Sequence, residues 1–439
     1  MKPIPALLLL SLAIGLPARG DEPAPSAPLT LAQALDAVLA RYPSLEGAQA
    51  AVDAARGRTV QSQADRLPQV SADAAYSYLS LRPYVALPLA GSSAAFYETI
   101  QNSYEARLGV RQLLSDFGRT DALVALARTG ELSAKDALEQ TRSQLGYQTI
   151  QAYYGVLLLR SAVSVSDEEI RALDEALRIS QRKFSGGSAT RFDVLTTQVR
   201  LANAHNNRTD TQSSLEKQEA LMRQLLGYEP GAPLALAGDF GAPGEPPDLS
   251  ATIAAGLQNR PEMKLARDSA DSANTRLDAA NRENRPTLAA SASAGVEDGQ
   301  LPEMYSNRGY VAAGVSVSVP IFTGQRITGQ RIEARADLRA AESRVDELHR
   351  TIATDVSDAL ADLKAAIARL ASADTLVAQA NEALNLAQTR YTNGVITNFE
   401  LLDAQSNARS AELARFQARY DCVIARHAVA RAAGEPPAP

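Results

Sequence analysis

Glu400 and Asp403 lie near the C-terminal end of the chain at a spacing that lets two carboxylates act together. They are three positions apart, so on a helix both side chains would share one face. Thr397 precedes Glu400 by three residues, which is the pattern of a capping box, and Thr190 and Asp193 repeat it. Glu400 therefore has two open roles: it caps a helix, or it belongs to an exposed acidic face.

Residue types that carry enzyme or metal chemistry show no matching pattern. The three histidines, His205, His349 and His427, share no metal-ligand spacing, and Gly186-Gly187 lacks the strand and the lysine of a phosphate loop. A net charge of −6 over 439 residues is also unlike the basic surface of a nucleic-acid binder. We expect no catalytic residue, no cofactor, no metal and no nucleic-acid partner.

Two long segments of the sequence are copies of one pattern. An alignment without gaps, at an offset of 207 positions, places RISQRKFSGGSATRFDVLTTQ, from Arg178, on NLAQTRYTNGVITNFELLDAQ, from Asn385. Each copy follows a ladder of apolar residues seven positions apart, which is typical of coiled-coil helices. The ladders are Val156, Val163, Ile170, Leu177 and Phe184, and Leu363, Leu370, Val377, Leu384 and Tyr391. Nearer the N-terminus the offset is 218, so the first copy holds 11 extra residues between Pro68 and Asp116.

The two copies predict very long helices. No proline interrupts Asp116 to Phe184 or Thr323 to Tyr391, and about 68 helical residues would form a rod of about 100 Å. Return helices should begin near Thr190 and Thr397. Few globular domains need helices of this reach.

Four segments instead alternate strictly between apolar and polar residues, which predicts strands. They lie at 69–82, 97–113, 287–297 and 308–320. Strands of about ten residues suit outer-membrane barrels, although a soluble hairpin lying on the helices is an alternative. Tyrosines near the far strand ends favour the membrane: Tyr76, Tyr78, Tyr84 and Tyr97. Four strands cannot close a barrel, so several chains must pool them, and a trimer would supply twelve.

The beginning of the chain reads as an export signal. Lys2, an apolar stretch and Ala18-Arg19-Gly20 form a signal peptide at 1–20, so the mature chain should begin near Asp21. The single cysteine, Cys422, excludes an internal disulfide and should be buried between helices.

The pattern as a whole resembles the TolC family of outer-membrane efflux and secretion channels, also called outer membrane factors. The likeness runs from Leu29 to about Ala433. Its motifs are QLLSDFGR from Gln112, VPIFTGQR from Val319, and the turn segments KFSGGSATRFDV and RYTNGVITNFELLD.

The resemblance implies an α+β fold that is mostly α: a trimer whose two tandem repeats per chain supply a coiled-coil helical tunnel and four membrane β-strands per chain. We predict repeat 1 at 21–227 with a tip turn at 184–190, a linker or equatorial segment at 228–247, repeat 2 at 248–433 with a tip turn at 391–397, and a disordered tail at 434–439. The protein would lie in the outer membrane and extend into the periplasm.

The implied function is that of a passive exit channel of a tripartite efflux pump, and not an enzyme. The implied partners are two further copies in a homotrimer, a periplasmic adaptor (membrane fusion) protein, an inner-membrane transporter of the RND, ABC or MFS type, and outer-membrane lipid. The exit duct of a type I protein secretion system is one alternative, and a soluble periplasmic coiled-coil scaffold or adaptor is another. The sequence leaves the cargo open.

The resemblance also implies roles for residues at the two helix-to-helix turns. The periplasmic entrance or gate would be formed by Asp193, Tyr391, Ile396, Glu400 and Asp403, with Tyr391 contacting Asp193 and a ring of carboxylates from Glu400 and Asp403. Ile396 stands where the family has an arginine, so the resemblance does not carry over one of the family's closing salt bridges. The adaptor-contacting turns would be formed by Ser185, Gly186, Gly187, Ser188, Asn393, Gly394 and Val395.

Overall fold

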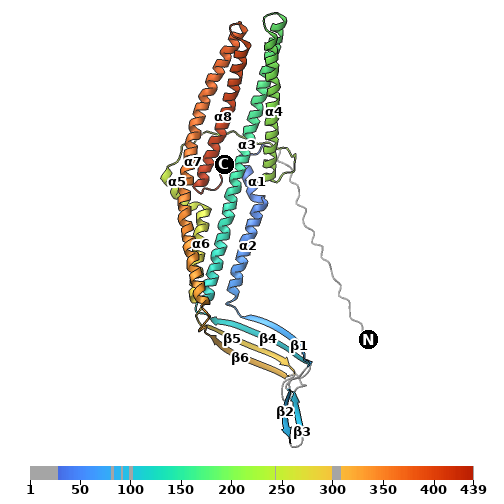
Figure 1. Ribbon diagram of the computed structural model, residues 1–439, viewed down its shortest axis with the longest axis vertical. Helices are drawn as coiled ribbons and strands as arrows, with labels where there is room; N and C mark the ends of the chain where they lie inside the picture. The colour runs from blue at the N-terminus through green and yellow to red at the C-terminus, as the bar shows by residue number, and fades with distance from the viewer. Residues whose placement is uncertain are drawn as a thin grey trace, which may run out of the picture.

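The computed structural model describes residues 28–80, 84–89, 92–97, 102–242, 244–298 and 308–438. The predicted signal peptide at 1–20 lies outside these ranges. The described chain is long and narrow, with helical hairpins at one end and a sheet at the other (Figure 1). Within these ranges, none of the helices has both the length and the apolar character needed to span a bilayer.

Two pairs of long helices dominate the molecule. In the first repeat α3 (Arg119–Ser185) is followed by the return helix α4 (Arg191–Leu226). In the second repeat α7 (Arg326–Thr392) is followed by α8 (Asn398–Ala432). Both α3 and α7 have 67 residues, which confirms the predicted rods of about 100 Å.

The start of α3 explains one motif that the sequence analysis singled out. In QLLSDFGR, the carboxylate of Asp116 accepts hydrogen bonds from the backbone N–H groups of Gly118, Arg119 and Thr120 at 3.1, 3.1 and 2.6 Å. Because the first N–H groups of a helix have no partner within it, this carboxylate stabilises the start of the helix. The chain can therefore change from strand to helix within a few residues.

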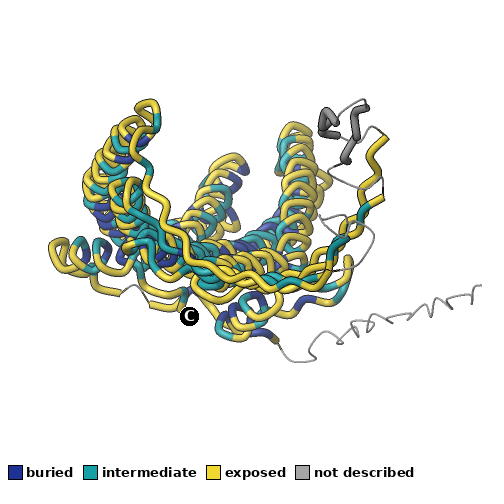
Figure 2. Tube along the Cα trace, turned by 90° about the horizontal axis from the view of Figure 1, so that it is seen from below, coloured by how far each residue is buried: buried dark blue, intermediate teal, exposed yellow. Residues whose placement is uncertain are grey.

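Shorter helices precede the strands in each repeat. They are α1 (Leu31–Arg41), α2 (Pro43–Ala64), α5 (Leu249–Asn259) and α6 (Pro261–Arg282). Helix α2 packs on α3, and α6 packs between α3 and α7. Seen from below, the helices and the sheet form an open arc (Figure 2).

Four strands form one antiparallel sheet in the order β1-β4-β5-β6. Their bounds are β1 (Gln69–Tyr78), β4 (Asn102–Ser115), β5 (Thr287–Glu297) and β6 (Arg308–Ser318). The last strand ends at Ser318, two residues before the predicted end at 320. The first strand ends at Tyr78 and not at 82: residues 79 and 80 lie outside any strand, and residues 81–82 lie outside the described ranges. The pairing of β4 with β5 joins the two repeats in one sheet, with a register shift between Leu113 and Ser115.

A second hairpin was not predicted. Strands β2 (Tyr84–Leu89) and β3 (Ser92–Tyr97) pair with each other in a separate sheet. The predicted strand at 97–113 therefore begins too early, because residue 97 belongs to β3. The hairpin lies in the part of repeat 1 that carries the 11 extra residues, so repeat 2 offers no counterpart to compare.

The core is divided between the two repeats. In the first cluster Ile150, Tyr153 and Met222 are among the most deeply buried side chains, and in the second Ile352, Val356 and Leu363 are. Cys422 belongs to the second cluster and is 3% exposed, so its predicted burial is confirmed. The Tyr153 hydroxyl donates to the carbonyl oxygen of Leu29 at 2.9 Å, which holds the segment before α1 beside α3.

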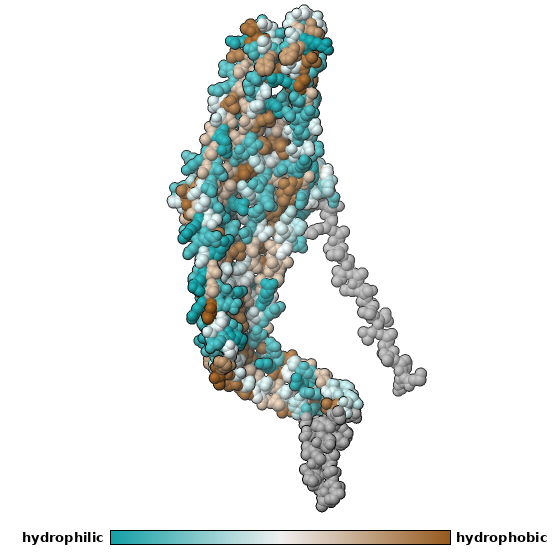
Figure 3. Space-filling model, in the orientation of Figure 1, coloured by the Kyte–Doolittle hydropathy of each residue, from teal (hydrophilic) through white to brown (hydrophobic). Residues whose placement is uncertain are grey.

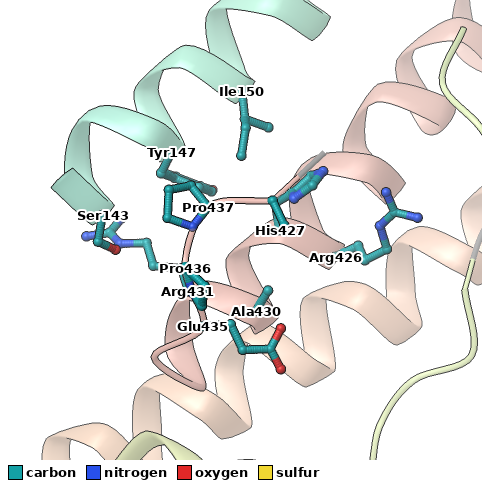
Figure 4. Close-up of a pocket in the computed structure, with 11 residues that line it drawn as sticks. Ser143, Tyr147, Ile150, Arg426, His427, Ala430, Arg431, Glu435, Pro436 and Pro437 are labelled. Carbon is teal, nitrogen blue, oxygen red and sulfur yellow. The ribbon is translucent and has the colours of Figure 1, made fainter. Parts of the chain in front are cut away.

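The end of the chain was predicted to be a disordered tail, but its described part packs on α3. Pro437 lies so close to Gly146 that a Cβ atom there would come within 2.4 Å of the proline ring. This segment forms one wall of a cavity of about 260 Å³ whose other walls include Tyr147, His427 and Arg431 (Figure 4). The physical reason is that a prolyl ring fits the surface that a glycine leaves open.

Candidate functional site: the tip of the helical hairpins

Both helix-to-helix turns lie at the end of the molecule opposite the sheet (Figure 1). Gly187 and Gly394 have φ angles of 78° and 72°, as predicted for glycines that reverse the chain. The N–H of Ser188 donates to the carbonyl of Lys183 at 2.8 Å, and the N–H of Val395 donates to that of Arg390 at 2.9 Å. The two turns thus share one backbone geometry. All of the residues predicted to contact an adaptor are exposed.

Capping boxes begin both return helices. The carboxylate of Asp193 accepts from the N–H and hydroxyl of Thr190 at 2.9 and 2.7 Å. The carboxylate of Glu400 accepts from the N–H and hydroxyl of Thr397 at 2.7 and 2.8 Å. The Thr397 N–H, and then its hydroxyl, lower the pKa of Glu400 below its usual range. Glu400 therefore caps α8, and it stays ionised while it does so.

Asp403 lies one turn further along α8 and takes no part in the cap. Its carboxylate is exposed and accepts a hydrogen bond from the Asn407 amide at 3.1 Å. Glu400 is exposed as well, so capping does not remove its charge from the surface. The two carboxylates share one face of α8, as their spacing predicts.

Tyr391 is buried at the end of α7, where it meets the first repeat. The ammonium of Lys183 lies 3.8 Å from the centre of the Tyr391 ring and donates to the Tyr391 carbonyl at 3.0 Å. The described hydrogen bonds of the Asp193 carboxylate come from Thr190, in the cap of α4. The contact expected between Tyr391 and Asp193 therefore stays a prediction. Ile396 is half-buried.

The structure also joins three polar residues that the sequence analysis missed. The amide nitrogen of Asn398 donates to the Thr197 hydroxyl at 3.0 Å and to the Asp193 carbonyl at 3.3 Å, and the Ser180 hydroxyl donates to the Asn398 amide oxygen at 3.5 Å. Asn398 is 5% exposed, and Ser180 and Thr197 are fully buried. We call these three residues the Asn398 network. One signal could have revealed it: repeat 1 has Arg191 where repeat 2 has Asn398.

The sheet end is the second region that bears on function. All ten residues of β1 are exposed, and so are apolar side chains of β6 such as Val311 and Val315, at 83% and 67%. Ile321 and Phe322, which follow β6, are 94% and 83% exposed, and Figure 3 shows apolar surface where the sheet meets the helices. Such a surface needs a covering of lipid or protein.

Comparison with known proteins identifies the family of the chain. The family model of the outer membrane efflux protein matches residues 34–228 and 253–435, which together span most of both repeats. The chain belongs to the outer membrane efflux protein family. It is accordingly an outer-membrane protein that extends into the periplasm, and it forms a passive duct instead of acting as an enzyme. The alternative of a soluble periplasmic scaffold or adaptor is therefore wrong.

Relatives in this family serve different transport systems. The chain is 25% identical to the outer membrane efflux protein BepC of Brucella suis over 74% of this chain and 71% of BepC. It is 26% identical to the alkaline protease secretion protein AprF of Pseudomonas aeruginosa over 74% of this chain and 68% of AprF. The fold matches that of the outer membrane protein VceC of Vibrio cholerae, with a TM-score of 0.75, 20% identity, and coverage of 92% and 95% of the two chains.

Within the described residues, no three His, Cys, Asp or Glu side chains gather closely enough to hold a metal ion. His427 lines the cavity beside the C-terminal segment and is 8% exposed (Figure 4). Burial, with a smaller contribution from Arg426, lowers the pKa of His427 to about 4. The imidazole is therefore neutral at ordinary pH. Its place in the wall of this cavity, away from the hairpin turns, gives it no part in the tip.

Proposed function

We propose that the protein is the exit duct of a tripartite efflux pump, assembled as a homotrimer and docked through its tip on a periplasmic adaptor and an inner-membrane transporter. The observation that carries this proposal is that helical hairpins of about 100 Å are joined to a four-stranded sheet whose outer strand β1 is exposed on both faces. A trimer would pool twelve strands into a closed sheet, leaving no unpaired edge in lipid.

Repeat-related residues with unequal exposure support the trimer. Leu402 of α8 is 1% exposed because it packs against α3 and α4, but Leu195, its counterpart in α4, is 48% exposed. Tyr391 is 7% exposed beneath Lys183, but its counterpart Phe184 is 46% exposed. In a ring of alternating hairpins, the second repeat of a neighbouring chain would cover Leu195 and Phe184, as the first repeat of the same chain covers their counterparts Leu402 and Tyr391.

We assign the tip two roles. The exposed turn residues, Ser185 to Ser188 and Asn393 to Val395, would contact the adaptor. Glu400 and Asp403 would line the entrance, where three chains would contribute a ring of carboxylates. The ring is compatible with the capping role of Glu400, because its carboxylate is ionised and exposed.

The similarity to AprF supports a second candidate, the outer-membrane duct of a type I protein secretion system. Deleting the gene in its own host separates the two candidates. For an efflux duct we expect at least a fourfold drop in the inhibitory concentration of lipophilic antibiotics, with unchanged secreted proteins. Loss of a secreted protein with unchanged antibiotic susceptibility would favour secretion.

A localisation experiment tests the duct itself. The mature protein should require detergent for release from the membrane fraction, and it should migrate as a trimer. Release as a monomer by a salt wash would refute both candidates.

A further inference from the structure

The two faces of the four-stranded sheet differ in charge. Side chains alternate along each strand and residues paired across a ladder share a face, so the register assigns every residue of the sheet to one face. The face that includes Val110, Val311 and Val315 has no charged residue within the four strands. In a barrel that crosses a membrane, the opposite face lines the lumen. That face holds all of the charged residues of the four strands: Asp73, Glu105, Arg107, Arg111, Glu297 and Arg308.

Carboxylates balance the arginines in the two rows that lie farther from the helices. The register places Glu105, Glu297 and Arg308 side by side in one row. In the next row the Arg107 guanidinium pairs with Asp73 at 3.3 Å and lies 3.8 Å from the Glu105 carboxylate. Together these rows hold three carboxylates and two guanidinium groups, so they carry no positive excess.

Arg111 lies closer to the helices and has no carboxylate in its row. The register places it opposite Gln69 on β1 and Ser291 on β5. In the part of the chain that the structure describes, its guanidinium takes part in no hydrogen bond or ion pair. Asp65 lines a hollow next to Arg111 but does not pair with it. Arg111 therefore adds to the lumen face a positive charge that no ion pair offsets.

Small side chains keep the space around the Arg111 guanidinium open. Gly109, Ser291 and Gly314 line a hollow of about 600 Å³ together with Arg107 and Arg111. A phosphate or carboxylate group in the lumen can thus approach Arg111 without displacing a bulky neighbour. A guanidinium suits both groups, because its N–H donors can bind two oxygens at once.

A trimer would bring three Arg111 side chains into one ring. Twelve strands about 4.8 Å apart and tilted by about 40° enclose a barrel about 24 Å across between backbones. The arginine side chains reach inward from that wall, and the Debye length is about 10 Å at 0.1 M salt, so each charge acts as far as the axis of the lumen. Salt screening therefore leaves the ring a field that a passing ion meets.

We propose that Arg111 forms a collar of three guanidinium groups at the inner mouth of the barrel, and that this collar binds solutes with phosphate or carboxylate groups on their way out. The inference rests on the proposed trimeric duct and adds to it a preference for anionic cargo. The collar lies at the opposite end of the molecule from the carboxylates proposed to line the entrance. An anion that has passed the tip therefore meets an attractive field at Arg111.

Block of the conductance by a polyvalent anion tests the collar. The probe is tripolyphosphate, added in planar bilayers to the compartment opposite the tips. We expect a reversible fall in the current of the wild type, and a half-blocking concentration at least fivefold higher for Arg111→Gln. Arg111→Lys keeps the charge and should keep most of the block, while sodium chloride at equal ionic strength controls for screening. Equal half-blocking concentrations for the wild type and Arg111→Gln would overturn the proposal.

Two further variants separate the unpaired charge from the paired charges. Asp73→Asn/Arg107→Gln removes both members of an ion pair, so the block should stay at its wild-type strength. Gly109→Glu leaves Arg111 in place but adds a carboxylate two residues away on the same face, and it should weaken the block as Arg111→Gln does. A Cβ atom at Gly109 would lie 3.4 Å from the Ser71 hydroxyl oxygen, which is an ordinary contact. A wild-type block in Gly109→Glu, or its loss in the variant without the ion pair, would contradict a site at Arg111.

Melting of the purified trimer gives a readout that does not depend on conduction. An anion that binds only the folded trimer raises its melting temperature. We expect tripolyphosphate to raise the melting temperature of the wild type by about 3 °C and that of Arg111→Gln by about 1 °C or less. Equal shifts would overturn the collar while leaving the duct intact. A protein that neither forms trimers nor conducts would instead refute the duct, and the collar with it.

Discussion

The two ends of the molecule differ in how much of their structure one chain completes. At the tip, each return helix has its own cap, each turn closes its backbone hydrogen bonds, and the Asn398 network satisfies buried groups from both repeats. At the sheet, β1 and β6 each lack a partner strand on one side within the described chain, and β1 is exposed along its whole length. The sheet end therefore depends on neighbours, whereas the described contacts of the tip are completed within one chain.

The largest expected effect is at the sheet. Val315→Arg places a charge on the apolar side of β6, where it should cost about 2–4 kcal/mol per chain if that side faces lipid. We expect most of the protein to be lost from the membrane fraction, as judged by immunoblot of detergent-extracted trimers. Ser316→Arg, on the opposite side of the same strand, is the matched control and should insert normally. Equal insertion of both variants would contradict a lipid-facing side.

The next effect is at the turns, where the tip should fail without loss of the trimer. Gly394→Val introduces a branched side chain at a φ of 72°, which costs about 1–2 kcal/mol and distorts the turn. We expect trimers at normal amounts but antibiotic efflux close to that of the deletion strain. Gly186→Ala, at a φ of −84°, should retain efflux. Normal efflux by Gly394→Val would argue against docking through this turn.

A smaller effect should follow from removing the acidic side chains at the entrance. The double variant Glu400→Ala/Asp403→Ala should lower the preference for cations over anions about twofold in bilayer recordings, since six carboxylates would leave the proposed ring. Thr397→Val disturbs the cap of α8 but keeps both carboxylates, and it serves as the control. A wild-type preference in the double variant would mean that Glu400 acts solely as a cap.

The smallest expected effect is on the pH dependence of stability, and it comes from His427, which lies away from both ends of the molecule. The pKa of His427 is about 4 in the fold and 6.5 in the unfolded chain, so the unfolded chain takes up the proton first as the pH falls. The stability that depends on neutral His427 is complete above pH 6.5 and is lost as the pH falls towards 4. We expect the melting temperature, followed by circular dichroism in detergent, to fall between pH 7 and pH 5 by roughly 2 °C more in the wild type than in His427→Gln. An equal fall in both would exclude this titration.

The sequence predicted the long helices and the strands because both depend on periodicity that extends over many residues. It also predicted the glycine turns and the caps, where local backbone geometry decides the residue type. The hairpin of β2 and β3 was missed because it lies in the stretch of repeat 1 that carries the 11 extra residues, where the repeat gives no second copy of the pattern to compare. The Asn398 network was missed because a buried polar group acquires its meaning from partners about 200 positions away. Whether Glu400 faces an entrance depends on neighbouring chains, which the pattern within one chain does not encode.

The pairing of β4 with β5 has a consequence for how the chain folds. The backbone N–H of Tyr104 donates to the side chain of Asp298, 194 residues further along the chain, at 2.6 Å, and β4 finds no second neighbour in its own repeat. The central ladder of the sheet cannot form until the chain has been synthesised through β5, in the first part of the second repeat, whereas the α3 and α4 hairpin needs only local contacts. Folding should therefore begin with the helical hairpins and end with the β4–β5 ladder, whose two strands come from different repeats.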